Sequence, residues 1–180
     1  MDIRETLDLL EAKNKHNLTQ VKLPYSRTGL SPVMSGTTID LHYGKLYKAY
    51  VDRYNKGEGD SSFNEAGAYL HSIFFSQFRA PATKKPTGHI LDLINRHHKN
   101  FVDFKQKFEE EAMKLQGSNW IYLSKSGQIK TIHNHAKRTD IALLVDMWEH
   151  AYQTDYGSNK AKYLNNIWRI INWDVINQRL

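Results

Sequence analysis

The chain has 180 residues, 40% of them hydrophobic and 24% charged, so it can bury a core as one compact unit or as two small lobes packed together. It contains no cysteine. Disulfides, thiolate metal sites and a cysteine nucleophile are therefore excluded, and a transition metal would have to be bound by imidazole and carboxylate groups. The nine histidines are the first residues to consider as ligands.

The formal net charge of +6 and the isoelectric point near 9.4 allow an anionic partner. Lys and Arg are scattered, and Lys84-Lys85 and Lys137-Arg138 are only pairs. Nucleic-acid-binding surfaces carry denser basic patches, so we expect no nucleic-acid partner. The positive charge fits the electrostatic steering of a small anionic substrate as well as it would fit nucleic acid. The longest apolar runs are too short to cross a bilayer and the N-terminus lacks a signal-peptide pattern, so we expect no membrane association and a cytoplasmic location.

Apolar spacing and turn-forming residues predict three helices in the first half of the chain. The first covers about residues 2–13, the second is capped by Thr37 or Thr38 and runs to about Asn55, and the third runs from about Ser62 to Phe78. The first helix lies in an N-terminal extension, residues 1–22. The other two are separated by a Gly-rich turn and form a helical hairpin. We assign residues 23–83 to this helical hairpin domain.

A linker with two prolines, Pro81 and Pro86, separates this domain from the rest of the chain, residues 84–180. Patterns in this second part predict helices over about 90–98, 101–115 and 160–171, and strands over 120–124, 129–133 and 141–145. The predicted fold class is α+β. An N-terminal helical hairpin lobe precedes a C-terminal α/β domain of helices around a three-stranded antiparallel sheet.

A carboxylate and an imidazole, Asp146 and His150, stand four residues apart where the third predicted strand ends. Side chains at such a position project into a site, but this spacing occurs by chance in many proteins, and single histidines on helices are usually solvated or hydrogen-bonded. The spacing alone is therefore a weak signal for a metal site.

The residues around this pair are more specific. Residues 146–152, Asp-Met-Trp-Glu-His-Ala-Tyr, resemble the D-x-W-E-H-A-Y signature of the iron/manganese superoxide dismutase family. Other segments resemble the family in the same order along the chain: 23–25, 38–51, 71–75, 86–88, 101–105, 117–120 and 171–173. The resemblance covers about residues 23–180 and implies four metal ligands, namely His42, His71, Asp146 and His150.

The resemblance further implies one Fe or Mn ion per subunit, which disproportionates superoxide to oxygen and hydrogen peroxide. It leaves the choice of metal open. The sequence His42-Tyr43-Gly44-Lys45 is typical of iron enzymes, a water-binding residue from the sheet lobe is the manganese-type arrangement, and a histidine in that role occurs with either metal. The resemblance assigns this role to His135, for which Gly67 leaves room. Tyr50 matches the tyrosine that guards the substrate funnel and passes protons.

Further residues match the surroundings of the family's site. Trp120 and Trp148 match its aromatic shell, and Lys160 stands where a basic residue usually attracts superoxide to the funnel mouth. Glu149 matches the residue that bonds a ligand histidine of the neighbouring subunit. We therefore expect a homodimer through Glu149 and His150.

Three positions depart from the family pattern. Leu46 replaces a gateway histidine, Leu70 an asparagine and Phe75 a tryptophan. These changes affect the proton relay and the polarity of the funnel rather than the ligands. They keep one alternative open, a non-catalytic structural or binding protein on the superoxide dismutase fold, which loss of ligands would mark.

Overall fold

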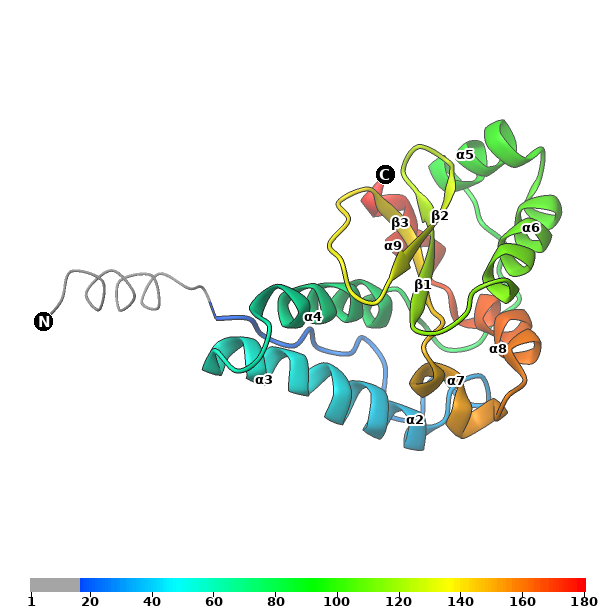
Figure 1. Ribbon diagram of the computed structural model, residues 1–180. Coiled ribbons are helices and arrows are strands. Elements are labelled where there is room, and N and C mark those ends of the chain that lie inside the picture. The colour runs from blue at the N-terminus through cyan, green and yellow to red at the C-terminus, as the bar shows by residue number, and fades with distance from the viewer. Residues whose placement is uncertain (1–16) are drawn as a thin grey trace, which may run out of the picture.

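The first lobe is a hairpin of helices that pack side by side (Figure 1). The computed structural model describes residues 17–180, so the helix predicted over 2–13 lies outside the described residues. The first arm comprises α2 (Gly36–Leu41), the π-helix η1 (His42–Tyr47) and α3 (Lys48–Lys56), and the second arm is α4 (Ser61–Ser76). The predicted hairpin is confirmed.

Small polar side chains start both arms of the hairpin. The Ser35 hydroxyl accepts a hydrogen bond from the amide of Thr38, so Ser35 caps α2, and the predicted caps Thr37 and Thr38 were wrong by two or three positions. Asp60 caps α4 in the same way through the amide of Phe63. These caps fix where the helices that carry the site begin.

The π-helical segment was not predicted, because apolar spacing in the sequence follows the ordinary period of 3.6 residues. Helices with this wider winding are rare, short and frequent at functional sites. It begins at His42 and ends at Tyr47, and both of these side chains are buried. The wider turn therefore presents an imidazole and a phenol to the interior.

An extended segment, which we call the N-terminal strap (residues 18–25), runs along the hairpin (Figure 1). The side-chain amide of Asn55 pairs with both the N–H and the C=O of Leu18. The Tyr43 hydroxyl donates to the carbonyl of Val21, and the amide of Val21 donates to the hydroxyl of Tyr47 at 3.1 Å. These four hydrogen bonds hold the strap by its main chain, and the side chains of Gln20 and Tyr25 add bonds to the carbonyls of Tyr43 and Phe75.

The second lobe is built on a three-stranded antiparallel sheet with strand order β2-β1-β3. Its elements are α5 (His89–His98), α6 (Phe101–Met113), β1 (Asn119–Ser124), β2 (Ile129–His133), β3 (Ile141–Asp146), α7 (Glu149–Tyr156), α8 (Lys160–Ile167), the 3₁₀ turn η2 (Trp168–Ile170) and α9 (Trp173–Arg179). All residues of β1 and β3 are buried, whereas β2 is half exposed. The three predicted strands are confirmed to within one residue at each end.

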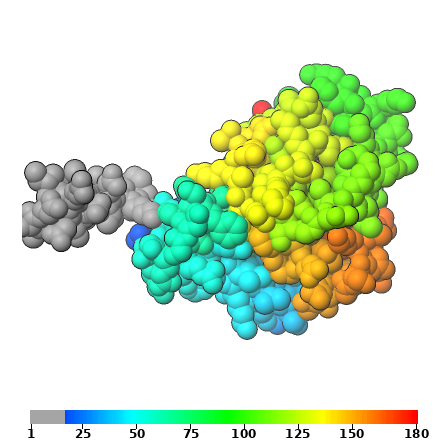
Figure 2. Space-filling model, viewed as in Figure 1, coloured from blue at the N-terminus to red at the C-terminus, as the bar shows by residue number. Residues whose placement is uncertain are grey.

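Two short helices, α7 and α9, were not predicted, and the helix predicted over 160–171 ends earlier, at Ile167. Viewed as a solid body, the hairpin continues without a visible break into the second lobe (Figure 2). No helix within residues 17–180 combines the length and the apolar character needed to cross a membrane.

Candidate metal centre

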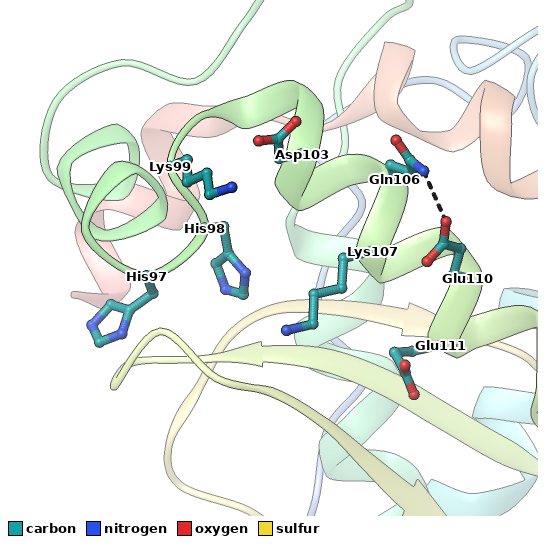
Figure 3. A pocket seen from close by; sticks show the side chains of 8 residues that line it. All are labelled: His97, His98, Lys99, Asp103, Gln106, Lys107, Glu110 and Glu111. Atoms are coloured by element: carbon teal, nitrogen blue, oxygen red, sulfur yellow. Dashed lines mark hydrogen bonds between the residues drawn. The ribbon is translucent and has the colours of Figure 1, made fainter.

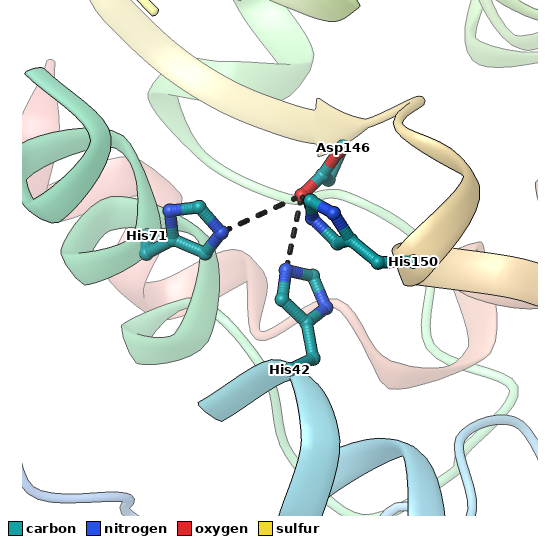
Figure 4. Close-up of side chains that lie close together, drawn as sticks. All are labelled: His42, His71, Asp146 and His150. Carbon is teal, nitrogen blue, oxygen red and sulfur yellow. Dashed lines mark hydrogen bonds and ion pairs between the residues drawn. The ribbon is translucent and has the colours of Figure 1, made fainter. Parts of the chain in front are cut away.

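Four side chains from both lobes meet where the hairpin contacts the end of the sheet (Figure 4). His42 begins the π-helix and His71 lies on α4, whereas Asp146 ends β3 and His150 lies in the first turn of α7. One potential ligand atom from each lies within 4.8 Å of the others. Three of the side chains are fully buried, and that of His150 is 16% exposed. The cluster has the size and composition of a site for one metal ion.

The carboxylate of Asp146 is the centre of the cluster. Its Oδ2 lies 3.0 Å from Nε2 of His42, 3.1 Å from Nε2 of His150 and 3.8 Å from Nε2 of His71. Its Oδ1 accepts a hydrogen bond of 2.8 Å from the amide of Trp148. Oδ1 is thus held by the main chain, and Oδ2 faces the three imidazoles.

Unpaired nitrogen atoms in the cluster allow a test of whether these residues fit a metal. Nδ1 of His71 lies 2.7 Å from the carbonyl of Gly67 and must carry the proton, because a carbonyl only accepts. Its Nε2 is therefore a bare lone pair, buried without a hydrogen-bond partner, and Nε2 of His42 also lacks one. Each buried unpaired group costs about 1–3 kcal/mol. A metal ion bound to these atoms would remove that cost, so the residues fit one.

The imidazoles of His42 and His71 are in the form that binds metals. Burial, reinforced by repulsion from His150, lowers the pKa of His42 to about 4. Burial also lowers the pKa of His71 well below its ordinary value, with a further contribution from His42. Burial would raise the pKa of Asp146, but attraction to His150 and His42, together with the hydrogen bond to His150, outweighs it and lowers that pKa. At neutral pH His42 and His71 therefore offer neutral nitrogens, and Asp146 offers an ionised carboxylate.

His135 lies beside the cluster, in the loop after β2 and only 8% exposed. Its Nδ1 accepts a hydrogen bond of 3.2 Å from the indole of Trp120, and the ring of Trp148 stacks on it with centroids 4.5 Å apart. Because an indole only donates, Nε2 of His135 carries the proton, and it is buried without a partner. His135 therefore holds a free N–H next to the four clustered side chains.

Tyr50 on α3 completes this side of the cluster. Its ring lies 5.4 Å from that of His71 and edge-on to that of His135 at 4.8 Å. Burial, with the charge of Asp146, raises the pKa of Tyr50 to about 12, so the phenol keeps its proton at neutral pH. A Cβ at Gly67 would lie 2.9 Å from Cγ of Tyr50 and 3.1 Å from Cδ2 of His135. Gly67 thus provides the room that the sequence analysis expected.

The three departures from the family pattern lie in different places. Phe75 is fully buried and packs edge-on against the ring of His42, with centroids 4.8 Å apart. Leu70 is also fully buried, and Leu46 is half-buried on the π-helix. Phe75 is therefore part of the wall of the cluster.

Two residues of this region were missed by sequence reasoning. The ring of Tyr47 is nearly parallel to that of His71, with centroids 5.6 Å apart, and the buried hydroxyl of Tyr163 donates to the main-chain carbonyl of Asp146 at 2.9 Å. Only the three-dimensional contacts identify them. Lys160, expected at a funnel mouth, donates to the carbonyl of Leu115.

A second group of charged side chains surrounds a surface hollow of about 450 Å³ away from the cluster (Figure 3). We call it the His97 hollow, and it is lined by His97, His98, Lys99, Asp103, Gln106, Lys107, Glu110 and Glu111. Its acidic and basic groups are mixed. Apart from the four-residue cluster, residues 17–180 hold no group of three or more side chains placed to bind a metal ion.

Comparisons with known proteins agree with this geometry. Residues 15–62 match the model of the alpha-hairpin domain of iron/manganese superoxide dismutases, and residues 86–179 match that of their C-terminal domain. The chain is 36% identical to a superoxide dismutase [Fe] of Bacteroides fragilis, across 88% of this chain and 97% of the relative. It is 37% identical to a superoxide dismutase [Fe] of Sulfolobus acidocaldarius, across 88% and 91%. A superoxide dismutase [Mn/Fe] of Porphyromonas gingivalis is 32% identical, across 88% and 97%. The chain belongs to the iron/manganese superoxide dismutase family.

Proposed function

We propose that this protein is a superoxide dismutase with one Fe or Mn ion per subunit, bound by His42, His71, Asp146 and His150. The observation that carries the proposal is the convergence of three imidazole Nε2 atoms on one buried carboxylate oxygen, within 3.8 Å or less. The family relationship supplies the substrate, superoxide, and the products, oxygen and hydrogen peroxide.

When bound, the metal supplies one-electron redox chemistry: one superoxide loses an electron and leaves as oxygen, and a second gains that electron and two protons. The protein positions donors for this second half-reaction. The unpaired Nε2–H of His135 and the protonated phenol of Tyr50 are hydrogen-bond donors beside the ligands, with rings 5.7 Å and 5.4 Å from that of His71. We assign both residues catalytic roles, His135 in hydrogen bonding at the centre and Tyr50 in delivering protons.

The protein also limits the access of water to the centre. Phe75, Trp120 and Tyr47 surround the ligand histidines with apolar ring surface and are almost fully buried. In such a low-dielectric environment the hydrogen bonds at the site are stronger than they would be in water.

We further propose a homodimer in which Glu149 bonds His150 of a second copy. Glu149 is exposed in the first turn of α7, and its carboxylate has no hydrogen-bond or ion-pair partner among the described residues. His150 beside it is the one clustered side chain that reaches the surface. Light scattering would detect the dimer, and a monomer for the wild type would contradict this proposal.

Three further assignments, to the domain boundaries, the biological role and the cellular location, are predictions. We propose the domain division of residues 1–22, 23–83 and 84–180, a role in antioxidant defence and a cytoplasmic location. Limited proteolysis would test the boundary near residue 83, growth under superoxide stress after removal of the protein would test the role, and cell fractionation would test the location.

The experiment that separates a dismutase from a non-catalytic protein on the same fold is a metal analysis combined with a superoxide-removal assay. We expect about one equivalent of Fe or Mn and rapid superoxide removal for the wild type. His71→Ala should lose both, because Nε2 of His71 is one of the converging atoms. His98→Ala, a matched change in the His97 hollow, should lose neither.

Two results would contradict the proposed function. The first is a wild-type protein that binds neither Fe nor Mn, and the second is a metal-loaded wild type that removes superoxide no faster than the free metal ion does. Retention of a full set of ligands already disfavours the non-catalytic alternative, for which loss of ligands was the expected mark.

A further inference from the structure

Gln77, the residue after α4, completes the outer edge of the sheet with its side chain. β3 is an edge strand, so its main chain needs partners other than β1. The side-chain amide of Gln77 donates to the carbonyl of Leu144, and the amide of Leu144 donates to Oε1 of Gln77 at 3.2 Å. Gln77 is fully buried. A side chain from the hairpin lobe therefore pairs with the strand that ends at Asp146.

Arg179, at the end of α9, binds the same place from the other side. Nη1 donates to Oε1 of Gln77 at 3.1 Å and to the carbonyl of Ala142 at 2.9 Å. Nη2 donates to the carbonyl of Ile73 at 2.8 Å and to the hydroxyl of Ser76 at 3.2 Å. One guanidinium thus bonds simultaneously to the end of α4, to β3 and to Gln77.

The charge of Arg179 has no carboxylate partner among the described residues, and its hydrogen bonds all go to neutral oxygens. Partial burial lowers the pKa of Arg179 to about 10, which leaves the group charged at neutral pH. Ile73 and Ser76 belong to the last turn of α4, where the helix dipole is negative. The charge of Arg179 is therefore compensated by the helix that carries His71.

These contacts lie close to the metal ligands along the chain. Ile73 follows His71 by two residues on α4, and Leu144 precedes Asp146 by two residues on β3. His71 and Asp146 belong to different lobes, so no regular secondary structure sets the distance between them.

We propose that Gln77 and Arg179 are positioning residues that hold α4 against β3 and so keep His71 and Asp146 at ligand distance before the metal binds. We call this pair the lobe clamp. The proposal rests on the proposed function, because it assigns the metal to these ligands. Without the clamp, part of the binding free energy of the metal would be used to bring the two lobes together, and the metal would dissociate faster.

The test compares clamp variants with a matched variant elsewhere in the core. Arg179→Met and Gln77→Leu remove the clamp, and Arg179→Lys keeps the charge but loses the forked geometry that reaches several acceptors at once. Ile94→Ala is the control, because Ile94 is a fully buried residue of α5 that makes none of these contacts. For each manganese-loaded protein we would measure the rate of metal loss to excess chelator, the visible absorption spectrum of the oxidised metal and the free energy of unfolding.

We expect Arg179→Met and Gln77→Leu to lose the metal about 10–100-fold faster than the wild type and to shift the visible absorption band, with Arg179→Lys in between. Ile94→Ala should keep the wild-type rate and spectrum although it is less stable. If a clamp variant does not fold, Arg179→Lys still provides the comparison.

Two outcomes would overturn the lobe clamp. In one, the folded clamp variants release metal at the wild-type rate. In the other, Ile94→Ala loses metal as fast as they do, which would make the effect one of general stability. A wild-type protein that takes up no metal would overturn both the clamp and the proposed function, whereas unchanged metal loss from loaded clamp variants overturns the clamp alone.

Discussion

Among residues 17–180, histidines gather at the metal centre and at the His97 hollow, and of these two places the metal centre alone has the properties of a binding site. At the metal centre, His42 and His71 are fully buried and point their Nε2 atoms at one carboxylate oxygen. In the hollow, His97 is exposed, and Nε2 of His98 lies 2.7 Å from the carbonyl of Gly127, an ordinary partner. The two places have similar residue types but opposite hydrogen-bonding states.

This difference shows that buried polar atoms without hydrogen-bond partners indicate a binding site better than residue types do. Water can satisfy every polar atom in the open hollow, so its side chains carry no free-energy cost that a ligand must remove. Bulk water does not reach the buried centre in this way, so its nitrogen lone pairs need a cation as partner. Matched substitutions at the metal centre and in the hollow therefore test this contrast.

The largest effect is expected for Asp146→Asn. The amide has no charge, and its NH₂ group would donate to the imidazole lone pairs instead of joining them in binding a cation. We expect less than about a tenth of the wild-type metal content and an equally large loss of superoxide removal. Glu110→Gln in the His97 hollow makes the same chemical change and should leave both unchanged. Full metal content in Asp146→Asn by elemental analysis would refute the assigned ligand set.

The second prediction concerns His135→Ala. This change removes the free N–H beside the ligands but none of the ligands. We expect the metal to remain bound and the turnover rate to fall about 10–100-fold, the range typical for residues that support a metal site. His97→Ala should keep the wild-type rate. Pulse radiolysis or stopped-flow assays would measure both, and a wild-type rate for His135→Ala would argue against its role.

A third pair compares two glycines whose added methyl group would meet a histidine ring. A Cβ at Gly67 would lie 3.1 Å from Cδ2 of His135, and one at Gly127 would lie 2.2 Å from Cδ2 of His97. We expect Gly67→Ala and Gly127→Ala each to lower the free energy of unfolding by about 1–3 kcal/mol, through overpacking and, at Gly127, a positive φ of 84°.

Activity should distinguish these two glycine variants. Gly67→Ala displaces His135 or Tyr50 and should slow turnover, whereas Gly127→Ala displaces only a ring of the hollow and should not. Urea denaturation and the superoxide assay on the same samples would give both quantities. Equal turnover in the two variants would mean that the position of His135 is not critical.

The smallest effect is expected at Lys99 in the hollow. Lys99 has φ 69° and ψ −51° at the end of α5, the conformation of a γ-turn closed by the bond from the amide of Asn100 to the carbonyl of His98, which is strained for any residue with a Cβ. Lys99→Gly should raise the free energy of unfolding by about 1 kcal/mol and leave turnover unchanged. If thermal unfolding showed that Lys99→Gly is less stable than the wild type, the lysine side chain would stabilise the fold by more than the backbone strain costs.

Much of the fold could be predicted from the sequence because its strands are short apolar runs between clear turns. The runs that became β1, β2 and β3 were located to within one residue. The helices α7 and α9 have only 8 and 7 residues, too few for a periodic pattern to stand out. The π-helix is wound more widely than an ordinary helix, so an apolar pattern with the ordinary helical period cannot reveal it.

For the site, the sequence indicated the four clustered residues through the family resemblance rather than through physical reasoning. It could not indicate which nitrogen of His135 carries the proton, because that depends on the indole of Trp120 across the strand pair. Nor could it indicate the bond from Arg179 to Gln77, which joins residues 102 positions apart. Such long-range contacts are determined by the packed fold.

The way in which the hairpin binds the N-terminal strap has a consequence for how this segment can change during evolution. The side chains of Asn55, Tyr43 and Tyr47 bond the main-chain groups of Leu18 and Val21, which every residue except proline provides in full. These hydrogen bonds exclude only proline at the two positions, whereas the packing of both side chains against the core favours apolar residues there. Asn55, Tyr43 and Tyr47 carry the hydrogen-bonding constraint, and we expect a homologue that lost Asn55 to lose the docked path of the strap.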